Sequence, residues 1–283
     1  MPELPEVETI RRGLNKFIIQ KSLVKIDVLN AKSFLGEKTF GKVKDIRRFG
    51  KALIINLDND SSLMIHLRMT GQLIFDPKTG NRYAAGHPSD NFISTLPNKQ
   101  TRVVLEFENG TLYFNDQRKF GFIKSLKTEE VENDSFIKKL AKEPWQMTGE
   151  ELYQKFQKHP NSSIKSIILD QSIICGLGNI YADESLFASQ IHPETKAGLL
   201  SKEDAKNLVK NARKVMDESI ASGGSTMATY VKADGSKGDY LEKFAKVFRK
   251  ENTPCPCCHE KIIKIKVAGR GTHLCPHCQR KIV

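Results

Sequence analysis

The first residues of the chain carry groups that could form a covalent bond with a substrate. Pro2 follows the initiator methionine, and Glu3 stands next to it. Removal of Met1 would leave the ring nitrogen of Pro2 as a free secondary amine, and such an α-amino group titrates near ~8, below the ~10.4 of a lysine. An unprotonated amine attacks an aldehyde-like carbon to give an iminium. Glu3 could donate or accept the proton that this reaction moves.

The same residues also fit a structural role, because proline and acidic side chains are favoured in the first turn of a helix. Apolar residues recur at three- and four-residue spacing from Leu4 onward. This pattern predicts an amphipathic helix from Glu3 to about Phe17. Taken alone, the stretch favours a helix start over an active site. The two interpretations are compatible, since a helix beginning near Pro5 would hold Pro2 rigidly.

The tail of the chain holds the clearest metal-binding pattern. Two residues separate Cys255 from Cys258, and sixteen residues later Cys275 and Cys278 repeat that spacing. Four thiolates in this arrangement are typical of tetrahedral Zn²⁺. Because four cysteines leave no open position, the pattern predicts one structural Zn²⁺, on which the folding of so small a segment should depend. Other possible ligands nearby are Cys257, His259, His273 and His277.

Two further stretches suit contacts with an anion. Between the cysteine pairs, apolar residues at 263, 265 and 267 alternate with lysines, which predicts a β-hairpin with a basic face and a tip at 269–271 that presents Arg270. A glycine-rich turn at 176–181 opens a helical pattern, where backbone N–H groups and the Asn179 amide could bind a phosphate. A simple helix–helix turn is the alternative for the second stretch, and the residues alone do not decide between the two.

Several side chains lie where loops meet the predicted strands. Lys51 comes directly before the apolar strand Ala52–Leu57, where a solvated lysine is the alternative to a functional one. Met69, and Arg118 with Phe120, fall in tight connections. Apolar and arginine side chains at loop tips suit wedging into a duplex and filling the position of a flipped base. Packing in the core is the alternative for Met69 and Phe120.

The charge balance indicates a polyanionic partner. The 283 residues include 45 Lys and Arg against 33 Asp and Glu, for a net charge of +12. Such a balance favours nucleic acid first and an anionic membrane surface second. No apolar run approaches the ~18–20 residues of a membrane span, and the acidic N-terminus does not resemble a signal peptide. We therefore expect a soluble, cytoplasmic protein with no membrane partner.

The order of the elements predicts an α+β chain of several domains, beginning with a helix and an antiparallel β-sandwich. The strands are expected at Leu23–Leu29, Val43–Arg47, Ala52–Leu57, Ser62–Leu67, Arg102–Phe107, Thr111–Asn115 and Phe122–Leu126, with a long mobile loop at Pro77–Gln100. Helices are expected at Glu150–Gln157, Ser163–Gln171, about Ile180–Ser189 and from Ser201 to the glycines at 223–224, followed by a loop at Ser225–Asp239. An acidic cluster at Thr128–Ser135 marks a boundary, and we expect domains at 1–130, 131–240 and 241–283.

Six ordered motifs together resemble one known family. They are MPELPEVET at 1–9, RRFGK at 47–51, HLRM at 66–69, RKFG at 118–121, GLGNIY at 176–181 and GRGTHLC at 269–275. Over essentially the whole chain they are similar to the formamidopyrimidine-DNA glycosylases of base excision repair, bacterial enzymes with a C-terminal zinc finger. The resemblance implies a β-sandwich, a helix–two-turn–helix domain and a four-cysteine zinc-finger hairpin, and double-stranded damaged DNA as the partner of a monomer that needs no other protein.

The resemblance implies catalytic roles for four residues. Pro2 matches the nucleophile that attacks the sugar carbon C1′, and Glu3 matches the acid that assists opening of the sugar ring. Lys51 matches the proton donor of β-elimination, and Arg270 matches the residue assigned to δ-elimination. The implied activity is that of a bifunctional glycosylase and AP lyase for oxidised purines, namely 8-oxoguanine and formamidopyrimidines.

The resemblance also implies contacts with DNA. Met69, Arg118 and Phe120 match a triad that fills the void left by the flipped base, while Lys165 and Asn179 match phosphate contacts. The loop at 225–239 matches one that caps oxidised purines.

The chain departs from the family pattern at a few positions. Lys99–Arg102 replaces a run that often contains histidines, Ser166 replaces a proline, and Phe248 with Arg249 replaces a tyrosine and a glycine. An endonuclease VIII-like enzyme for oxidised pyrimidines is the nearest alternative, and Leu4 with the purine-capping loop favours the purine enzyme. A non-catalytic DNA-binding zinc-finger protein is the alternative from another class.

Overall fold

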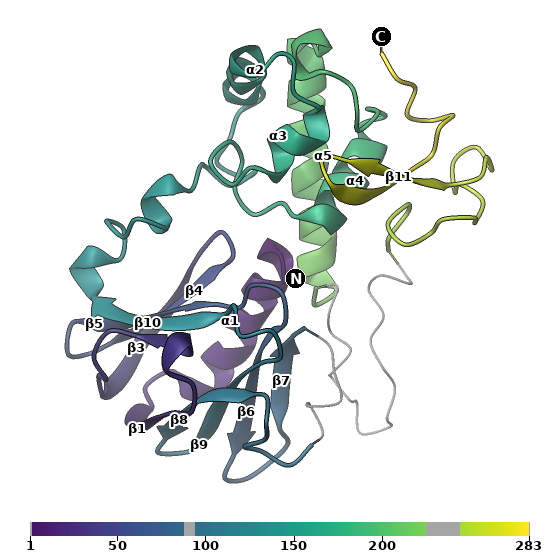
Figure 1. The fold of residues 1–283 in the computed structure, drawn as a ribbon. Coiled ribbons are helices and arrows are strands. Elements are labelled where there is room, and N and C mark those ends of the chain that lie inside the picture. The colour runs from purple at the N-terminus through teal and green to yellow at the C-terminus, as the bar shows by residue number, and fades with distance from the viewer. Residues whose placement is uncertain (1, 88–93, 225–243, 283) are drawn as a thin grey trace. The chain divides into compact units, whose positions relative to one another are not determined.

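The computed structural model describes residues 2–87, 94–224 and 244–282. The chain divides into two compact units, which we describe separately (Figure 1). The sheet unit comprises Met1–Lys138 with Gly223–Asp239, and the helical unit comprises Lys139–Ser222 with Tyr240–Val283. The finer division into three domains at residues 130 and 240 stays a prediction, and the predicted loop at 225–239 lies outside the described residues.

The sheet unit begins with α1 (Leu4–Ile18), which confirms the predicted amphipathic helix. Glu3 and Glu6 form a capping box at its start. The apolar face of α1 packs on a core that continues through both halves of the sheet, and the helix contacts β3 and β4 on one side and β6 and β7 on the other.

The strands of this unit confirm the predicted sandwich and extend it. They are β1 (Ser22–Val28), β2 (Phe34–Leu35), β3 (Gly41–Phe49), β4 (Ala52–Leu57), β5 (Ser61–His66), β6 (Gly71–Pro77), β7 (Tyr83–Gly86), β8 (Thr101–Phe107), β9 (Gly110–Asp116) and β10 (Phe122–Lys127). Their order is β2-β10-β5-β4-β3-β1-β8-β9-β6-β7, so the pairing of β1 with β3 joins two halves. The pairs are antiparallel except β2 with β10, which is parallel.

The prediction of a loop throughout Pro77–Gln100 is wrong in part. Tyr83–Gly86 forms β7, which pairs with β6 and closes that edge of the sheet. The ring of Tyr83 stacks on Phe17 of α1 at 5.6 Å between ring centroids, and its hydroxyl donates to the Thr9 carbonyl at 3.3 Å. The strand was missed because it is short and lies among turn-forming residues. Residues 88–93 lie outside the described part of the chain.

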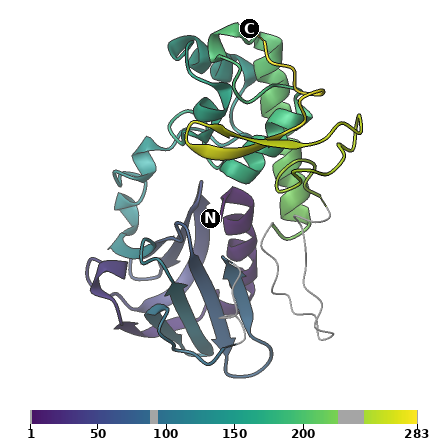
Figure 2. The same cartoon turned by 45° about the vertical axis from the view of Figure 1, so that its right-hand side comes forward.

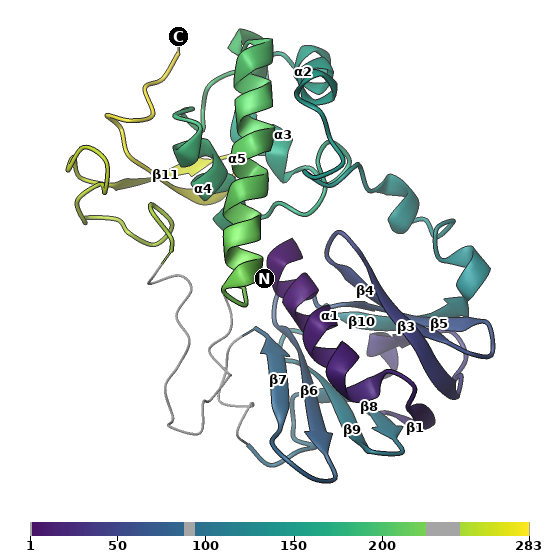
Figure 3. The same ribbon diagram turned by 180° about the vertical axis from the view of Figure 1, so that it is seen from behind.

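The helical unit contains α2 (Gly149–Lys158), α3 (Ile164–Leu169), α4 (Asn179–Ala188) and α5 (Lys202–Ala221), close to the predicted ranges. α5 packs along α2 and α4 (Figure 3). The hairpin of β11 (Ile263–Val267) and β12 (Arg270–Leu274) lies against α4 through β12 (Figure 2). Short 3₁₀ helices lie at Ala31–Ser33, Thr128–Glu130, Ile137–Lys139 and Ala197–Leu199.

Side chains cap the helices of this unit. Thr148, Ser163 and Ser201 each accept a hydrogen bond from a backbone N–H in the first turn of α2, α3 and α5. Among the residues that the structure describes, no helix is both long and apolar enough to cross a bilayer.

Candidate functional site

The N-terminal candidates are fixed by the start of α1. Pro2 is buried, and Glu3 is only 2% exposed. The backbone N–H of Glu3 donates to Glu6 Oε2 at 2.7 Å, as part of the capping box. Glu3 is therefore both a predicted catalytic residue and the N-cap of α1. The capping box with Glu6 holds the backbone next to Pro2 in place.

One buried carboxylate ties α1 to the turn that carries Lys51. Glu8 accepts from Arg11 at 2.8 Å, from Arg12 at 2.8 Å and from Arg48 at 3.2 Å. Arg48 also donates to the carbonyl of Gly50 at 3.0 Å, directly before Lys51. Burial alone would raise the pKa of Glu8, but the hydrogen bonds from the arginines outweigh it and lower the pKa to about 2.

The role of Glu8 was not predicted from the sequence. Arginines three and four residues after a glutamate on a helix are a detectable signal, but they indicate an ordinary surface pair. The decisive partner is Arg48, which is 40 residues away in the chain, and local spacing gives no sign of it.

Lys51 is buried, with 7% of its surface exposed, so the alternative of a solvated lysine does not hold. It follows Gly50, whose φ of 54° lies in the left-handed region that glycine tolerates. The next residue, Ala52, pairs with His66 across β4 and β5. Burial, and then the charges of Arg68 and Lys51, lower the pKa of His66 to about 3, so the imidazole beside Lys51 is neutral near pH 7.

The three loop-tip residues are exposed. Met69 is 37% exposed and Phe120 is 56% exposed, which excludes the core-packing alternative for both. The guanidinium of Arg118 lies over the ring of Phe120, 4.9 Å from the centroid. This contact groups a cation with an aromatic ring at one tip. Their use against DNA stays a prediction.

Lys165 and Asn179 both contact the finger hairpin. The ammonium of Lys165 is 2.5 Å from Asp183 Oδ1 and 2.7 Å from Thr272 Oγ1. The amide of Asn179 donates to the carbonyl of Gly271 at 2.9 Å, and Lys165 Nζ lies 3.4 Å from the same oxygen. The two residues therefore hold β12 directly after Arg270.

The burial of Lys165 corrects one expectation. Lys165 and Asp183 are both 0% exposed, so the ammonium is not placed to reach a phosphate directly. The physical reason is that a buried ammonium needs a charged partner, and Asp183 provides it from α4. Ser166, which replaces the family's proline, keeps a backbone N–H that donates to the Ser163 cap at 3.3 Å.

A second buried carboxylate of α4 supports the segment before the finger. Glu184 accepts from the backbone N–H groups of Lys246, Val247 and Phe248 at 2.8–3.0 Å. Burial raises the pKa of Glu184 although these three donors oppose the shift. No sequence signal singles out Glu184, because its partners are backbone groups about sixty residues away.

The four predicted cysteines come together. Their Sγ atoms lie within 4.8 Å of one another, with 3.8 Å between Cys255 and Cys278 and 3.4 Å between Cys258 and Cys275. A tetrahedral Zn²⁺ with Zn–S bonds near 2.3 Å needs sulfurs about 3.8 Å apart. The backbone N–H groups of Cys257 and Cys278 also donate to ligand sulfurs, at 3.4 and 3.5 Å. The cluster thus fits one structural Zn²⁺.

The hairpin tip is displaced from the prediction. Ala268 and Gly269 form the two-residue turn, with φ of 48° and 76°. Two positive φ values are typical of the tight turn that matches the twist of a hairpin. Arg270 is consequently the first residue of β12, opposite Val267, and it is exposed.

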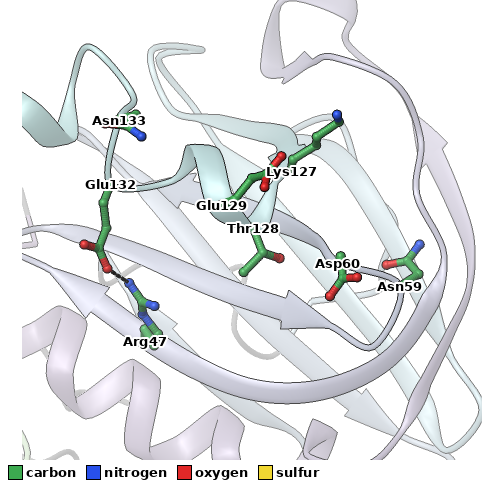
Figure 4. A pocket seen from close by; sticks show the side chains of 8 residues that line it. All are labelled: Arg47, Asn59, Asp60, Lys127, Thr128, Glu129, Glu132 and Asn133. Atoms are coloured by element: carbon green, nitrogen blue, oxygen red, sulfur yellow. Dashed lines mark hydrogen bonds and ion pairs between the residues drawn. The ribbon is translucent and has the colours of Figure 1, made fainter.

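An open cavity of about 830 Å³ lies elsewhere on the sheet unit, beside β3 and the 3₁₀ helix at 128–130 (Figure 4). Charged side chains line it, and an ion pair of 2.7 Å joins Arg47 to Glu132 across it. No predicted catalytic or DNA-binding residue lines this cavity.

Family models match three parts of the chain. The formamidopyrimidine-DNA glycosylase N-terminal domain matches residues 1–123, the formamidopyrimidine-DNA glycosylase H2TH domain matches residues 140–231, and a zinc finger found in FPG and IleRS matches residues 253–280.

Full-length relatives agree with these matches. A formamidopyrimidine-DNA glycosylase of Streptococcus thermophilus is 37% identical, with 99% of this chain and 100% of that protein covered. A mutant of the Lactococcus lactis FPG, solved with DNA containing Fapy-dG, is 33% identical with a TM-score of 0.85. The wild-type Lactococcus lactis FPG, solved with DNA containing an oxidised pyrimidine, is 33% identical with a TM-score of 0.83. Each structural match covers 99% of this chain and 100% of the other. The chain belongs to the formamidopyrimidine-DNA glycosylase family.

Proposed function

We propose that the protein is a bifunctional DNA glycosylase and AP lyase of base excision repair that removes oxidised purines from double-stranded DNA. The observation that carries this proposal is the buried pair Pro2 and Glu3 at the start of α1, with Lys51 on a turn that Glu8 and Arg48 tie to the same helix. An amine, an acid and a lysine on one scaffold suit a lyase better than a glycosylase that uses only water.

The reaction follows from a free amine at Pro2. Its nitrogen attacks C1′ as the bond from C1′ to the damaged base breaks, and Glu3 gives a proton to the sugar-ring oxygen as the ring opens. The resulting iminium makes the neighbouring C2′ hydrogen acidic, so its loss expels the 3′ phosphate, and a second elimination expels the 5′ phosphate. Lys51 moves a proton in the first elimination, and Arg270 binds the phosphate in the second.

The remaining predicted residues act on the duplex. Met69, Arg118 and Phe120 fill the space left by the flipped nucleotide, which their exposure and the stacking of Arg118 on Phe120 support. Asn179, at the first turn of α4, contacts a backbone phosphate. Lys165 is buried and supports the DNA-binding surface indirectly, because its ammonium donates to Thr272 in β12, the strand that carries Arg270.

The four cysteines hold Zn²⁺, which would supply the folding energy of the hairpin and no catalytic step. We further propose three domains at 1–130, 131–240 and 241–283, and a monomer that works in the cytoplasm on chromosomal DNA. A net charge of +12 supports binding to DNA.

Borohydride trapping tests the nucleophile. The protein is incubated with a duplex that contains 8-oxoguanine, and peptide mass spectrometry locates the adduct. We expect the adduct on the nitrogen of Pro2 in a chain that lacks Met1, and the control variant Pro160→Gly, at an exposed proline, should trap equally well. An adduct on a lysine would overturn the assignment of Pro2, and no adduct would favour the non-catalytic DNA-binding alternative.

The lesion class needs a separate test, because a relative has been solved with DNA containing an oxidised pyrimidine. Duplexes with 8-oxoguanine and with thymine glycol compete for cleavage in one reaction. Faster cleavage of the purine lesion is expected, and the reverse order would support the endonuclease VIII-like alternative.

A further inference from the structure

Two surface turns of the sheet unit lie side by side because of the way its strands are connected. Residues 67–70, here called the Met69 turn, join β5 to β6, and residues 117–121, here called the Phe120 turn, join β9 to β10. β5 pairs with β10, and β6 pairs with β9. Both turns therefore cross between the two halves of the sheet at the same place, where Gly71 lies opposite Asp116.

One buried carboxylate binds both turns. Asp116 is 1% exposed, and its Oδ1 accepts from the hydroxyl of Thr70 in the Met69 turn and from the N–H of Arg118 at 3.1 Å. Its Oδ2 accepts from the N–H of Gly121 at 2.7 Å, at the far end of the Phe120 turn. Thr70 Oγ1 also accepts from the N–H of Arg118, at 3.0 Å.

Each turn contains one residue with a positive φ, and hydrogen bonds hold the backbone around it. Arg68 and Lys119 have φ of 52° and 58°, a region that residues with side chains rarely adopt. The N–H of Arg68 donates to His66 Nδ1 at 3.0 Å, while the hydrogen bonds of Asp116 hold the two ends of the Phe120 turn. A buried carboxylate in turn requires several donors, so the turns and Asp116 stabilise each other.

We propose that Asp116 is a positioning residue that, through Thr70, joins the Met69 turn and the Phe120 turn into one rigid wedge. Met69 and Arg118 with Phe120 then enter the duplex as a unit, and the side chain that replaces the flipped base arrives together with the one that contacts the opposite strand. The inference rests on the proposed function of these exposed residues and adds the group that couples them.

The substitution Thr70→Val tests the coupling, because it removes the bridging hydroxyl and keeps the size of the side chain. Excision is measured under single-turnover conditions on a duplex with 8-oxoguanine, and strand cleavage is measured on a single-stranded oligonucleotide with an AP site. The loss of one hydrogen-bond bridge should slow the duplex reaction about tenfold. The single-stranded reaction should keep its rate, because that substrate has no opposite strand and no void to fill.

Two further variants control for general damage. Thr70→Ser keeps the hydroxyl and should restore the rate on the duplex. Thr39→Val removes a half-buried hydroxyl that bonds to Ser61 at the start of β5, away from both turns, and it should behave as the wild type on both substrates. Equal slowing of both substrates by Thr70→Val would mean a merely structural role and would overturn the proposal.

Arg118→Ala separates this proposal from the function on which it rests. If Arg118→Ala leaves the duplex reaction unchanged, the void-filling role fails. If Arg118→Ala slows the duplex reaction and Thr70→Val does not, the void-filling role stands and the coupling through Asp116 is wrong.

Discussion

The sheet unit and the finger hairpin, residues 253–280 of the helical unit, support their predicted DNA-contacting residues by different means. In the sheet unit, one apolar core runs from α1 through both halves of the sheet, and the buried carboxylates of Glu8 and Asp116 add polar contacts. The apolar cluster at the finger hairpin is small and contains Phe187 of α4, Val247 and Ile262 together with the four cysteines. The sheet unit is stabilised by burial of apolar surface, whereas we expect the small finger hairpin to depend on bound metal. Loss of metal should therefore damage the finger hairpin and leave the sheet unit intact.

Removal of zinc should give the largest difference in stability between the sheet unit and the finger hairpin. Structural Zn²⁺ contributes about 10–16 kcal/mol in small zinc-finger peptides, so a strong chelator should unfold the hairpin and leave the sheet unit folded. Hydrogen exchange followed by mass spectrometry is the measurement, with DNA binding followed in parallel. We expect peptides of 253–280 to lose protection while peptides of α1 keep theirs.

Two cysteine variants make this test specific. Cys258→Ser should lose the metal and the protection of the finger. Cys257→Ser should retain both, because Cys257 is exposed and is not one of the four clustered residues. If the finger hairpin keeps its protection after complete loss of zinc, its stability does not depend on metal and the proposed contrast with the sheet unit is wrong.

The buried pair of Lys165 and Asp183 should give the next largest effect. Lys165→Met leaves Asp183 buried without its cation, which typically costs about 3–5 kcal/mol. Because Thr272 and Gly271 lose the same partner, the strand after Arg270 should loosen and DNA affinity should fall. Urea unfolding and titration of an AP-site duplex measure the two effects.

The charge itself can be separated from the loss of packing. Lys165→Met with Asp183→Asn should recover part of the stability, because the amide removes the uncompensated charge and its oxygen can still accept from the backbone N–H of His273, which donates to Asp183 at 2.9 Å. Lys202→Met removes one partner of an exposed ion pair with Glu150 and should change little. A stability loss in Lys165→Met no greater than that in Lys202→Met would contradict the assigned role.

Features that depend on residues close together in the chain were predictable from the sequence, and features that depend on contacts between distant segments were not. The helices and most strands were predictable because apolar periodicity acts within each element, and the cysteine spacing sufficed for the metal cluster. β7 was missed because small residues among turn formers carry no strand signal. Glu184 and the Arg48 partner of Glu8 were missed because their contacts join segments that only the fold brings together. The burial of Lys165 likewise depends on Asp183, which sequence reasoning did not pair with it.

The smallest expected effect concerns Glu8, whose loss tests whether the sheet unit depends on its polar contacts as the finger does. The pKa of Glu8 is lowered from 4.5 to about 2. A carboxyl group with a lowered pKa stabilises the folded state above its unfolded pKa, and this stabilisation disappears as the pH falls through about 2. After allowance for screening by solvent, we expect Glu8→Gln to lower the free energy of unfolding by about 2 kcal/mol at pH 6. The difference from the wild type should shrink as the pH falls from 4.5 toward 2, and urea unfolding across this range measures it.

Because the apolar core under α1 is untouched, Glu8→Gln should still fold at pH 6, unlike the finger hairpin without zinc. A loss that is independent of pH would mean that Glu8 acts through packing rather than charge, and unfolding at pH 6 would mean that the sheet unit is no more robust than the finger.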